Sequence, residues 1–308
     1  MKFIKFYVAF MVLVQSTSVF AQQELQLSTY FFNPLITNSA YAGSQKSLMI
    51  NAVVRDQWTG FKGSPKSQVL TIHTPLKGNA NMGLGGTLIN DAIGAHSNKT
   101  ITFDYSIGVK LNKKGHRLNF GLKAGLDIYQ TNFSKSKIQD NTEDIYAQNF
   151  SYTKLLPNAG ASLYYYGDKF YLGAGSPRIV KNSYNLPSGQ NAWQENHIYL
   201  FGGMVFKINS LLSVRPSFNA KYVKNAPLSA EVNLSFFILE KIWLGAMYRH
   251  NSAFGANALF YLNESLNIGY AYDYSITQIQ RYSNGSHEIM MSYKFKSKSK
   301  GYNSPRYF

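Results

Sequence analysis

Apolar and polar residues alternate at every second position along most of this chain. Between Arg117 and Gln130 one set of alternate positions is apolar, and the other set is small, polar or charged. The apolar set is Leu118, Phe120, Leu122, Ala124, Leu126 and Ile128. The same pattern recurs in residues 101–111, 197–208, 212–222, 228–236 and 265–274. A period of two is that of a β-strand with two different faces, so the pattern predicts an all-β fold.

The alternation predicts about fourteen strands, with boundaries that such patterns place only to within a few residues. They lie near residues 48–55, 66–74, 81–90, 99–111, 117–130, 156–167, 168–176, 196–208, 211–224, 228–239, 240–250, 253–263, 264–276 and 286–296. Tight turns at 113–115, 167–168, 209–210, 240–241 and 263–264 contrast with long connections at 131–155, 177–195 and 277–285. Short turns on one rim and long loops on the other are typical of outer-membrane barrels.

A soluble β-sandwich would show the same alternation, so the chemistry of the second face must distinguish the two folds. In this chain that face consists of Gly, Ser and Asn with few charges, and the strands run about 9–12 residues, a length suited to a tilted membrane crossing. Charged residues make up 15% of the sequence and aromatic residues another 15%, whereas soluble domains carry roughly 25% charged residues. We therefore predict a transmembrane antiparallel β-barrel.

The amino-terminal residues have the features of a secretory signal. Lys2 and Lys5 precede an apolar stretch over residues 6–14, and Val19-Phe20-Ala21 fits a cleavage site. We predict a signal peptide at 1–21, a periplasmic lead-in at 22–47, a barrel at 48–296 and a tail at 297–308, with both termini in the periplasm. A role of the lead-in as a plug of the lumen is left open. The chain has no cysteine, which excludes a lipoprotein anchor, disulfides and thiolate chemistry.

The formal net charge is +16, and such a basic balance can indicate a nucleic acid or anionic lipid partner. Because the lysines concentrate in turns, we expect no nucleic acid partner. We expect outer-membrane lipid around the barrel. Charges of both signs fall on the predicted inner face. These are Asp104, Lys110, Arg117, Lys123, Asp127, Arg215, Lys221, Glu231, Arg249 and Asp273. Such charges either pair with one another or line a channel, and the mixed signs favour pairing.

No arrangement of residues predicts catalysis, a cofactor or a metal. The six histidines are scattered singly, without an H-x-x-x-H or a G-x-S-x-G motif. A membrane hydrolase built from His73 with Asp91, His96 or Ser97 is a further alternative. We expect a protein that is not an enzyme.

The segment 33–65 differs from the repetitive strands because it crowds Gly, Pro, Asn and aromatic residues into turns. Together with the chain's aromatic ending it supplies our candidate partner-binding residues. They are Asn33, Pro34, Tyr41, Gln57, Trp58, Gly60, Phe61, Arg306, Tyr307 and Phe308. We predict residues 56–65 at the outer rim and residues 33–44 on the periplasmic side.

Motifs in a fixed order along the mature chain resemble the PorP/SprF family of Bacteroidetes. They include Asn33-Pro34, Tyr41-Ala-Gly-Ser44, Arg55-x-Gln-Trp-x-Gly60, Gly63-Ser-Pro-Lys66, Asn90-Asp-x-Ile-Gly94, Phe120-Gly-Leu-Lys-Ala-Gly125, Trp243-Leu-Gly245, Gly269-Tyr-x-Tyr-Asp-Tyr274 and His287-Glu-Ile-Met290. The chain has Ser39 where the family usually has a proline.

This resemblance implies an outer-membrane component of the type IX secretion system. Its implied partners are a secreted cargo protein, such as a gliding adhesin, or the cargo's C-terminal sorting domain, and periplasmic ring or motor components. The resemblance does not separate a core role in the machinery from a cargo-specific one. A passive porin or solute transporter is the alternative that the polar inner face leaves open.

Overall fold

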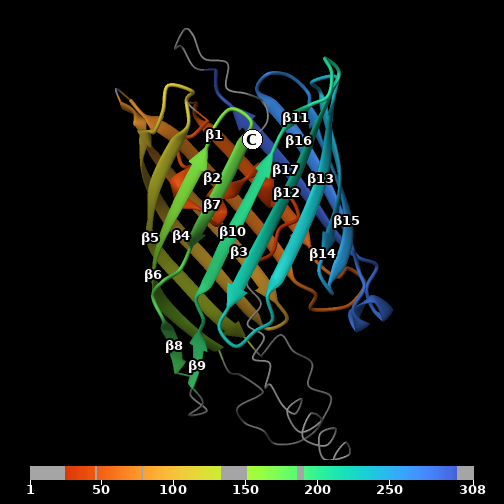
Figure 1. Ribbon diagram of the computed structural model, residues 1–308. Helices are drawn as coiled ribbons and strands as arrows, with labels where there is room; N and C mark the ends of the chain where they lie inside the picture. The colour runs from red at the N-terminus through yellow and green to blue at the C-terminus, as the bar shows by residue number, and fades with distance from the viewer. Residues whose placement is uncertain (1–24, 46, 78, 133–150, 186–190, 297–308) are drawn as a thin grey trace, which may run out of the picture.

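The computed structural model describes residues 25–45, 47–77, 79–132, 151–185 and 191–296. Of the described strands, 15 form one closed antiparallel sheet, a barrel whose strands are tilted against its axis, and the other two form a separate hairpin (Figure 1). Among the described residues no helix is long and apolar enough to cross a membrane. The predicted fold class, a transmembrane antiparallel β-barrel, is confirmed.

The strands follow one another around the wall in the order of the sequence. Their bounds are β1 Met49–Asp56, β2 Lys66–Leu76, β3 Asn79–Ile93, β4 His96–Lys110, β5 Arg117–Asn132, β6 Ser151–Tyr166, β7 Phe170–Ser176, β8 Asn182–Asn185, β9 Asn191–Gln194, β10 His197–Met204, β11 Phe206–Lys207, β12 Leu212–Val223, β13 Ser229–Ile238, β14 Ile242–Arg249, β15 Ala253–Tyr261, β16 Leu266–Ser275 and β17 Ser286–Lys294. Four 3-10 helices complete the described part: η1 Tyr30–Phe32, η2 Pro34–Ile36, η3 Ser39–Tyr41 and η5 Gln278–Arg281.

Two pairings close the barrel. The first and last strands pair along their whole length, from Met49 opposite Lys294 to Asp56 opposite His287. Strand β10 pairs with both β7 and β12, and β11 continues β10 along β12 after an interruption at Val205. The 15 strands of the sheet among the described residues therefore make fourteen crossings of the wall, since β10 and β11 are two parts of one. This count agrees with the sequence prediction.

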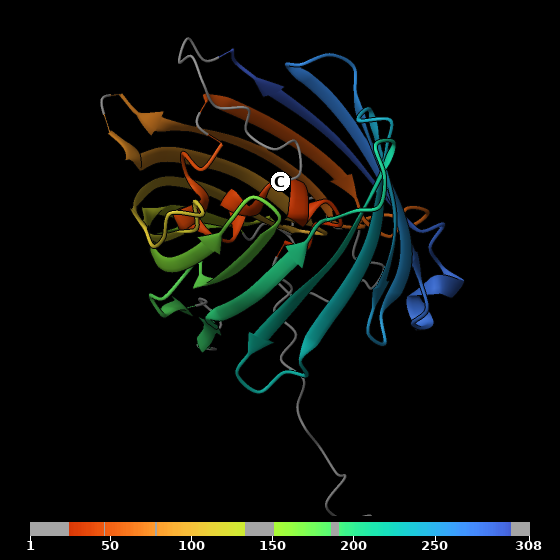
Figure 2. The ribbon, with the colours of Figure 1, turned by 45° about the horizontal axis from the view of Figure 1, so that its top comes forward.

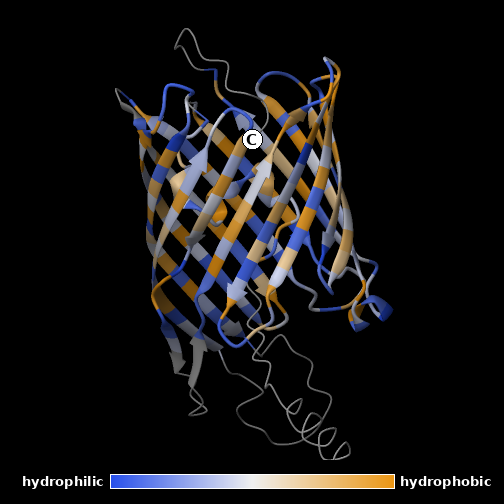
Figure 3. Cartoon of the chain, in the orientation of Figure 1, coloured by the Kyte–Doolittle hydropathy of each residue, from blue (hydrophilic) through white to orange (hydrophobic). Residues whose placement is uncertain are grey.

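The faces of the wall are inverted relative to a soluble protein. Along β4 every second side chain points into the lumen and is small or polar, while those between are apolar and face outwards. Phe103 is 72% exposed on the outside, whereas its neighbour Asp104 is 2% exposed inside. Figure 3 shows the resulting alternation of hydrophilic and hydrophobic residues along the strands. An apolar outer surface and a polar interior are what a membrane-embedded barrel requires.

Long and short connections separate onto the two rims. The connections after β1, β5, β7 and β16 leave one rim, which we call the long-loop rim. Phe295 follows the end of β17 at the opposite, short-turn rim. Strands β5 and β6 extend into the predicted loop 131–155, whose residues 133–150 lie outside the described part. The predicted loop 177–195 contains the hairpin β8–β9, which alternation did not reveal because each strand has only four residues.

The residues that precede the first strand lie inside the barrel. Residues 25–44, here called the plug, contain η1, η2 and η3 and cross the lumen between the walls (Figure 2). Near its start, Ser28 contacts Glu288 in the long-loop half of β17. At its other end, Gly43 contacts His73 in the short-turn half of β2. The segment predicted as a periplasmic lead-in thus runs through the lumen, which was the role left open for it.

Candidate functional site

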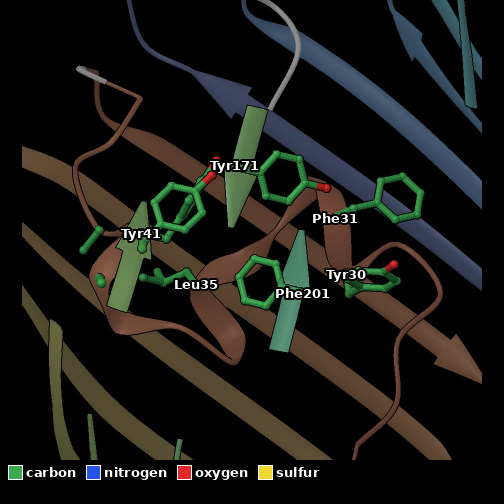
Figure 4. Packing of buried hydrophobic residues seen from close by; sticks show 9 residues of the cluster. Tyr30, Phe31, Leu35, Tyr41, Tyr171 and Phe201 are labelled. Carbon is green, nitrogen blue, oxygen red and sulfur yellow. The ribbon is translucent and has the colours of Figure 1, made fainter. Parts of the chain in front are cut away.

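The plug's apolar residues fill the middle of the lumen. Phe31, Leu35 and Ala40 are 0% exposed and form one cluster with aromatic side chains of β6, β7 and β10 (Figure 4). The wall contributes Tyr164, Tyr171 and Phe201 to this cluster. Burying a large apolar side chain contributes roughly 1.5–3 kcal/mol. The aromatic residues on the inner face of these strands therefore have a partner in the plug.

Two tyrosines of the plug sit in the same dry environment. Burial raises the pKa of the Tyr30 phenol, and the nearby Glu231 carboxylate raises it further. Burial likewise raises the pKa of the Tyr41 phenol, whose oxygen accepts a hydrogen bond from Gln45 at 3.0 Å. Both phenols are neutral at physiological pH, so the plug adds no negative charge to the lumen.

Two glycines of the wall let the plug's backbone approach directly. A Cβ at Gly83 would lie 2.2 Å from the carbonyl oxygen of Ala42, and one at Gly121 would lie 2.1 Å from the backbone nitrogen of Ala40. The three nearest atoms to each added Cβ all belong to the plug. These positions can therefore take no side chain while the plug is seated.

Polar contacts fix the plug's second half to the wall. The hydroxyls of Ser39 and Ser162 lie 2.8 Å apart, and the Ala40 N–H donates to the Ser162 hydroxyl at 2.9 Å. Asn119 donates its amide to the Ala40 carbonyl at 3.0 Å, and Ser106 donates its hydroxyl to the Ala42 carbonyl at 2.7 Å. Small polar residues on the inner face thus satisfy backbone groups that the irregular plug cannot pair internally.

The histidines considered for a hydrolase are not brought together. His73 accepts the Gly43 N–H on Nδ1 at 3.2 Å and packs against the Tyr41 ring in the short-turn half. His96 begins β4 at the long-loop rim, where its Nδ1 lies 2.9 Å from the Thr131 hydroxyl. Among the described residues no three His, Cys, Asp or Glu side chains form a group that could hold a metal.

A buried carboxylate holds the first half of the plug. Glu288 accepts the backbone N–H groups of Ser28 at 2.8 Å and Thr29 at 2.9 Å, and it also accepts the Thr29 hydroxyl. Arg55 lies between Glu288 at 2.9 Å and Asp273 at 2.7 Å, and Asp273 accepts the Ser28 hydroxyl at 2.5 Å. These contacts, here called the latch, involve only side chains exposed by 3% or less.

The latch belongs to a larger ion-pair network across the lumen wall. Arg249 pairs with Glu231 at 2.7 Å and lies 3.5 Å from Asp273, so the network joins β1, β13, β14, β16 and β17. Buried charges are tolerated only when they are paired and hydrogen-bonded. Removing one partner would therefore leave an uncompensated charge.

Arg215 holds the plug in a different way. Its guanidinium carbon lies 4.7 Å from the Phe31 ring and 4.9 Å from the Phe32 ring, both in the plug, and 4.2 Å from the Trp243 ring of the wall. Cation–π contacts of this kind are worth about 2 kcal/mol when desolvated.

Two further ion pairs confirm the predicted pairing inside the barrel. Lys123 pairs with Asp104 at 3.0 Å and donates to the Leu35 carbonyl of the plug at 3.4 Å. Arg178, from the connection after β7, pairs with Asp127 at 2.8 Å. Lys110 and Arg117, which were also predicted on the inner face, are exposed and half-buried near the short-turn rim.

A cleft remains between the plug and the wall on the side of β10, β12 and β13. It is lined by Leu25, Gln26, Leu27, Tyr30, Asn33, Ile36, Thr37, Tyr199, Asn219, Lys221, Ser229 and Glu231. Buried atoms among these, including Asn33 Nδ2 and Glu231 Oε1, have no hydrogen-bond partner within the described part of the chain. The plug's backbone is thus in direct contact with β3 and β5, whereas a cleft remains beside part of β10, β12 and β13.

Two loops join at the long-loop rim just above the latch. The connection 57–65 is bonded to the connection 276–285 through Thr59, whose N–H donates to Gly285 at 2.8 Å and whose carbonyl accepts from Asn284 at 2.6 Å. The Trp58 N–H donates to the Ser286 hydroxyl at 3.1 Å. We call these two connections the loop pair. Tyr282 stands out from it and is 70% exposed.

Trp58 and Gly60 give the loop pair its unusual backbone. Trp58 has φ 52°, a left-handed conformation that is strained for a bulky side chain. Gly60 has φ 118° and packs against the Tyr282 carbonyl, where a Cβ would lie at 3.2 Å. The Trp-x-Gly motif of the sequence therefore shapes this turn.

The candidate partner-binding residues fall into separate places. Asn33, Pro34 and Tyr41 are buried in the plug. Trp58 and Phe61 are half-buried and Gly60 is exposed in the loop pair, while Gln57 is 9% exposed beneath it. The predicted residues 306–308 lie outside the described part of the chain. The two described groups do not form one surface.

Sequence reasoning placed Lys123, Arg215 and Asp273 on the inner face, but it missed Arg55, Glu288 and the two glycines that also hold the plug. Arg55 lies on the lumenal face of β1 with Asn51 and Val53, so the alternation of that strand carried a signal for its inward direction. Gly83 and Gly121 resembled ordinary small residues within strands. Nothing in the sequence indicates that a second backbone passes over them.

The closed barrel, with its apolar outer face and its polar lumen, has the fold of an outer-membrane β-barrel. A family profile described as "Type IX secretion system membrane protein PorP/SprF" matches residues 19–293, which include both the plug and the wall. The chain belongs to this family, as its motifs indicated. A comparison with curated proteins gives no match.

Among solved structures, the chain is similar to outer-membrane barrels at low sequence identity. The Ralstonia pickettii toluene transporter TbuX is 9% identical, with a TM-score of 0.50, over 83% of this chain and 91% of that chain. The outer membrane protein Omp33 of Acinetobacter baumannii is 8% identical, with a TM-score of 0.45, over 81% of this chain and 98% of that chain. At this identity the likeness concerns the fold alone.

Proposed function

We propose that this barrel is a non-enzymatic outer-membrane component of the type IX secretion system that binds a secreted protein and supports its export or surface anchoring. The observation that carries the proposal is the family match over residues 19–293. The expected partner is a secreted cargo protein, such as a gliding adhesin, or its C-terminal sorting domain. Periplasmic ring or motor components would meet the opposite rim.

The orientation follows from the convention that short turns of outer-membrane barrels face the periplasm. The long-loop rim would then face outwards, where a cargo arrives. The loop pair is the preferred contact there, because its backbone is fixed by hydrogen bonds and it exposes Tyr282 beside the half-buried Trp58 and Phe61. Exposed aromatic side chains on a rigid support are typical anchors of protein interfaces.

The alternative of a permanently open porin requires an unobstructed lumen. Residues 25–44 occupy the lumen of this barrel, and Phe31, Leu35 and Ala40 of the plug are wholly buried there. The plug therefore favours the binding role over permanent passive diffusion.

The test is deletion of the gene followed by complementation with single variants. Without the barrel, we expect one surface protein to be lost from the cell surface, and continued display of every type IX cargo would refute the proposal. Tyr282→Ala should assemble normally but reduce the amount of cargo that co-purifies. Tyr222→Ala is the matched control, because Tyr222 is 52% exposed on β12, outside the loop pair.

A further inference from the structure

The wall of this barrel is complete without the plug. All the pairings of the 15-stranded sheet run between wall strands, and β1 with β17 and β10 with β12 close the ring. The plug contributes three 3-10 helices and no strand to the sheet. Its departure would therefore break no ladder hydrogen bond of the wall.

The lumen beneath the plug is suited to water. The inner face there carries charged side chains of both signs, namely Arg55, Asp104, Lys123, Asp127, Arg215, Glu231, Arg249, Asp273 and Glu288. Polar, charge-lined interiors are those of water-filled barrels. The described plug residues carry no Lys, Arg, Asp or Glu, so they leave this wall chemistry intact when they move.

The plug is held along its length as well as at its two ends. Its apolar side chains pack on aromatic residues of β6, β7 and β10, and Arg215 of β12 lies against the rings of Phe31 and Phe32. Glycine contacts and serine hydrogen bonds hold residues 39–43 against β3, β5 and β6. The latch holds Ser28 and Thr29 at the other end. A cleft lined by residues of β10, β12 and β13 interrupts these contacts. The latch is the charged attachment of the plug's first residues, at the end nearest the long-loop rim.

We propose that residues 25–44 form a removable plug, and that release of the latch at Glu288 converts the barrel into an open channel for small hydrated ions and solutes. The latch lies directly beneath the loop pair, since Arg55 and Glu288 face each other across β1 and β17 and Trp58 is bonded to Ser286. A contact made at the long-loop rim is therefore transmitted to the latch before it is transmitted to the plug's other attachments. This channel activity does not depend on cargo binding.

The first test uses glycine substitutions whose nearest contacts are all in the plug. The double variant Gly83→Ala/Gly121→Ala places two methyl groups where the plug's backbone lies, 2.2 and 2.1 Å from its atoms. Gly86→Ala is the matched control on the same strand, because its Cβ would meet no atom closer than 3.6 Å. In planar bilayers with potassium chloride, we expect wild type and control to be mostly closed and the double variant to conduct at least about ten times more often.

The second test locks the plug to the wall. The sequence has no cysteine, and the Ser39 and Ser162 hydroxyls are 2.8 Å apart, so Ser39→Cys/Ser162→Cys can form a single disulfide. Glu288→Gln removes the charged acceptor of the latch, and we expect it to raise the open fraction about tenfold, as loss of a charge-assisted hydrogen bond would. Adding the lock should abolish this rise, and a reductant should restore it.

The outcomes distinguish a plug that can leave the lumen from a plug that stays in it permanently. A folded Gly83→Ala/Gly121→Ala barrel that stays silent would overturn the proposal, as would equal conductance of the Gly86→Ala control. Folding is checked by heat-modifiable migration in gels. If the double variant does not fold, Glu288→Gln becomes the deciding variant. The proposal fails if Glu288→Gln stays closed. It also fails if the Glu288→Gln current persists when the Ser39→Cys/Ser162→Cys disulfide is formed.

Discussion

At the scale of single residues, the inner charges are organised around pairs that join distant parts of the chain. Arg55 is held by Asp273 and Glu288, which lie 218 and 233 residues away in the sequence. Alternation could place each of these side chains on the inner face, but not opposite its partner. Only the register of β1 against β17, with Arg55 opposite Glu288, brings the pair together.

This pair makes a prediction about stability. Arg55→Ala should lower the free energy of unfolding by about 3–5 kcal/mol. Glu288 would remain buried without its cation, and Asp273 would keep only the more distant Arg249, at 3.5 Å. The double variant Arg55→Ala/Glu288→Gln should be less destabilised than the sum of the two single variants, since residues in one network do not contribute additively. Urea unfolding in lipid vesicles measures the free energy of unfolding of the two single variants and the double variant. Strict additivity would show that the two side chains do not stabilise each other.

At the scale of elements, the wall could be predicted from the sequence and the plug could not. A strand whose faces meet lipid and water has a period of two, and this signal located all fourteen crossings. The plug has no such period, because its backbone turns three times within residues 30–41 and is buried on all sides. Its contacts are supplied by wall residues such as Gly121 and Ser162, whose significance appears only once the barrel is closed.

The assignment of the outer face leads to a second prediction. Phe103 lies on the outer face in the middle of β4 and is 72% exposed. If that face meets the hydrocarbon core, Phe103→Lys should cost about 2–4 kcal/mol of folding free energy in bilayers. Phe295→Lys is the matched control at the short-turn rim, where the cost should be about 0–1 kcal/mol. Equal costs at the two positions would contradict this placement of the membrane.

At the scale of the whole molecule, the path of the chain is unusual for a barrel. The described chain starts in the long-loop half, where Leu25 lines the cleft together with Ser229, the first residue of β13. It crosses the lumen to His73 and then begins β1 in the short-turn half. The wall ends at that same short-turn rim, at Lys294 beside Met49. The even number of crossings fixes the two ends of the wall, while the plug carries the preceding residues to the opposite side.

This path predicts that the position just before the plug and the end of the wall are reached from opposite sides of the membrane, in place of the expectation that both termini lie in the periplasm. An epitope inserted directly before Leu25 should be labelled by antibody on intact cells, because the plug delivers that end to the long-loop rim. An epitope after Phe308 should be labelled only in permeabilised cells, because β17 ends at the short-turn rim. Epitopes within residues 224–228 and 111–116 serve as controls for the two rims. If the epitope before Leu25 is hidden on intact cells that do label at 224–228, then residues 25–44 do not thread the lumen from the outer side. The plug would in that case have to enter from the periplasm.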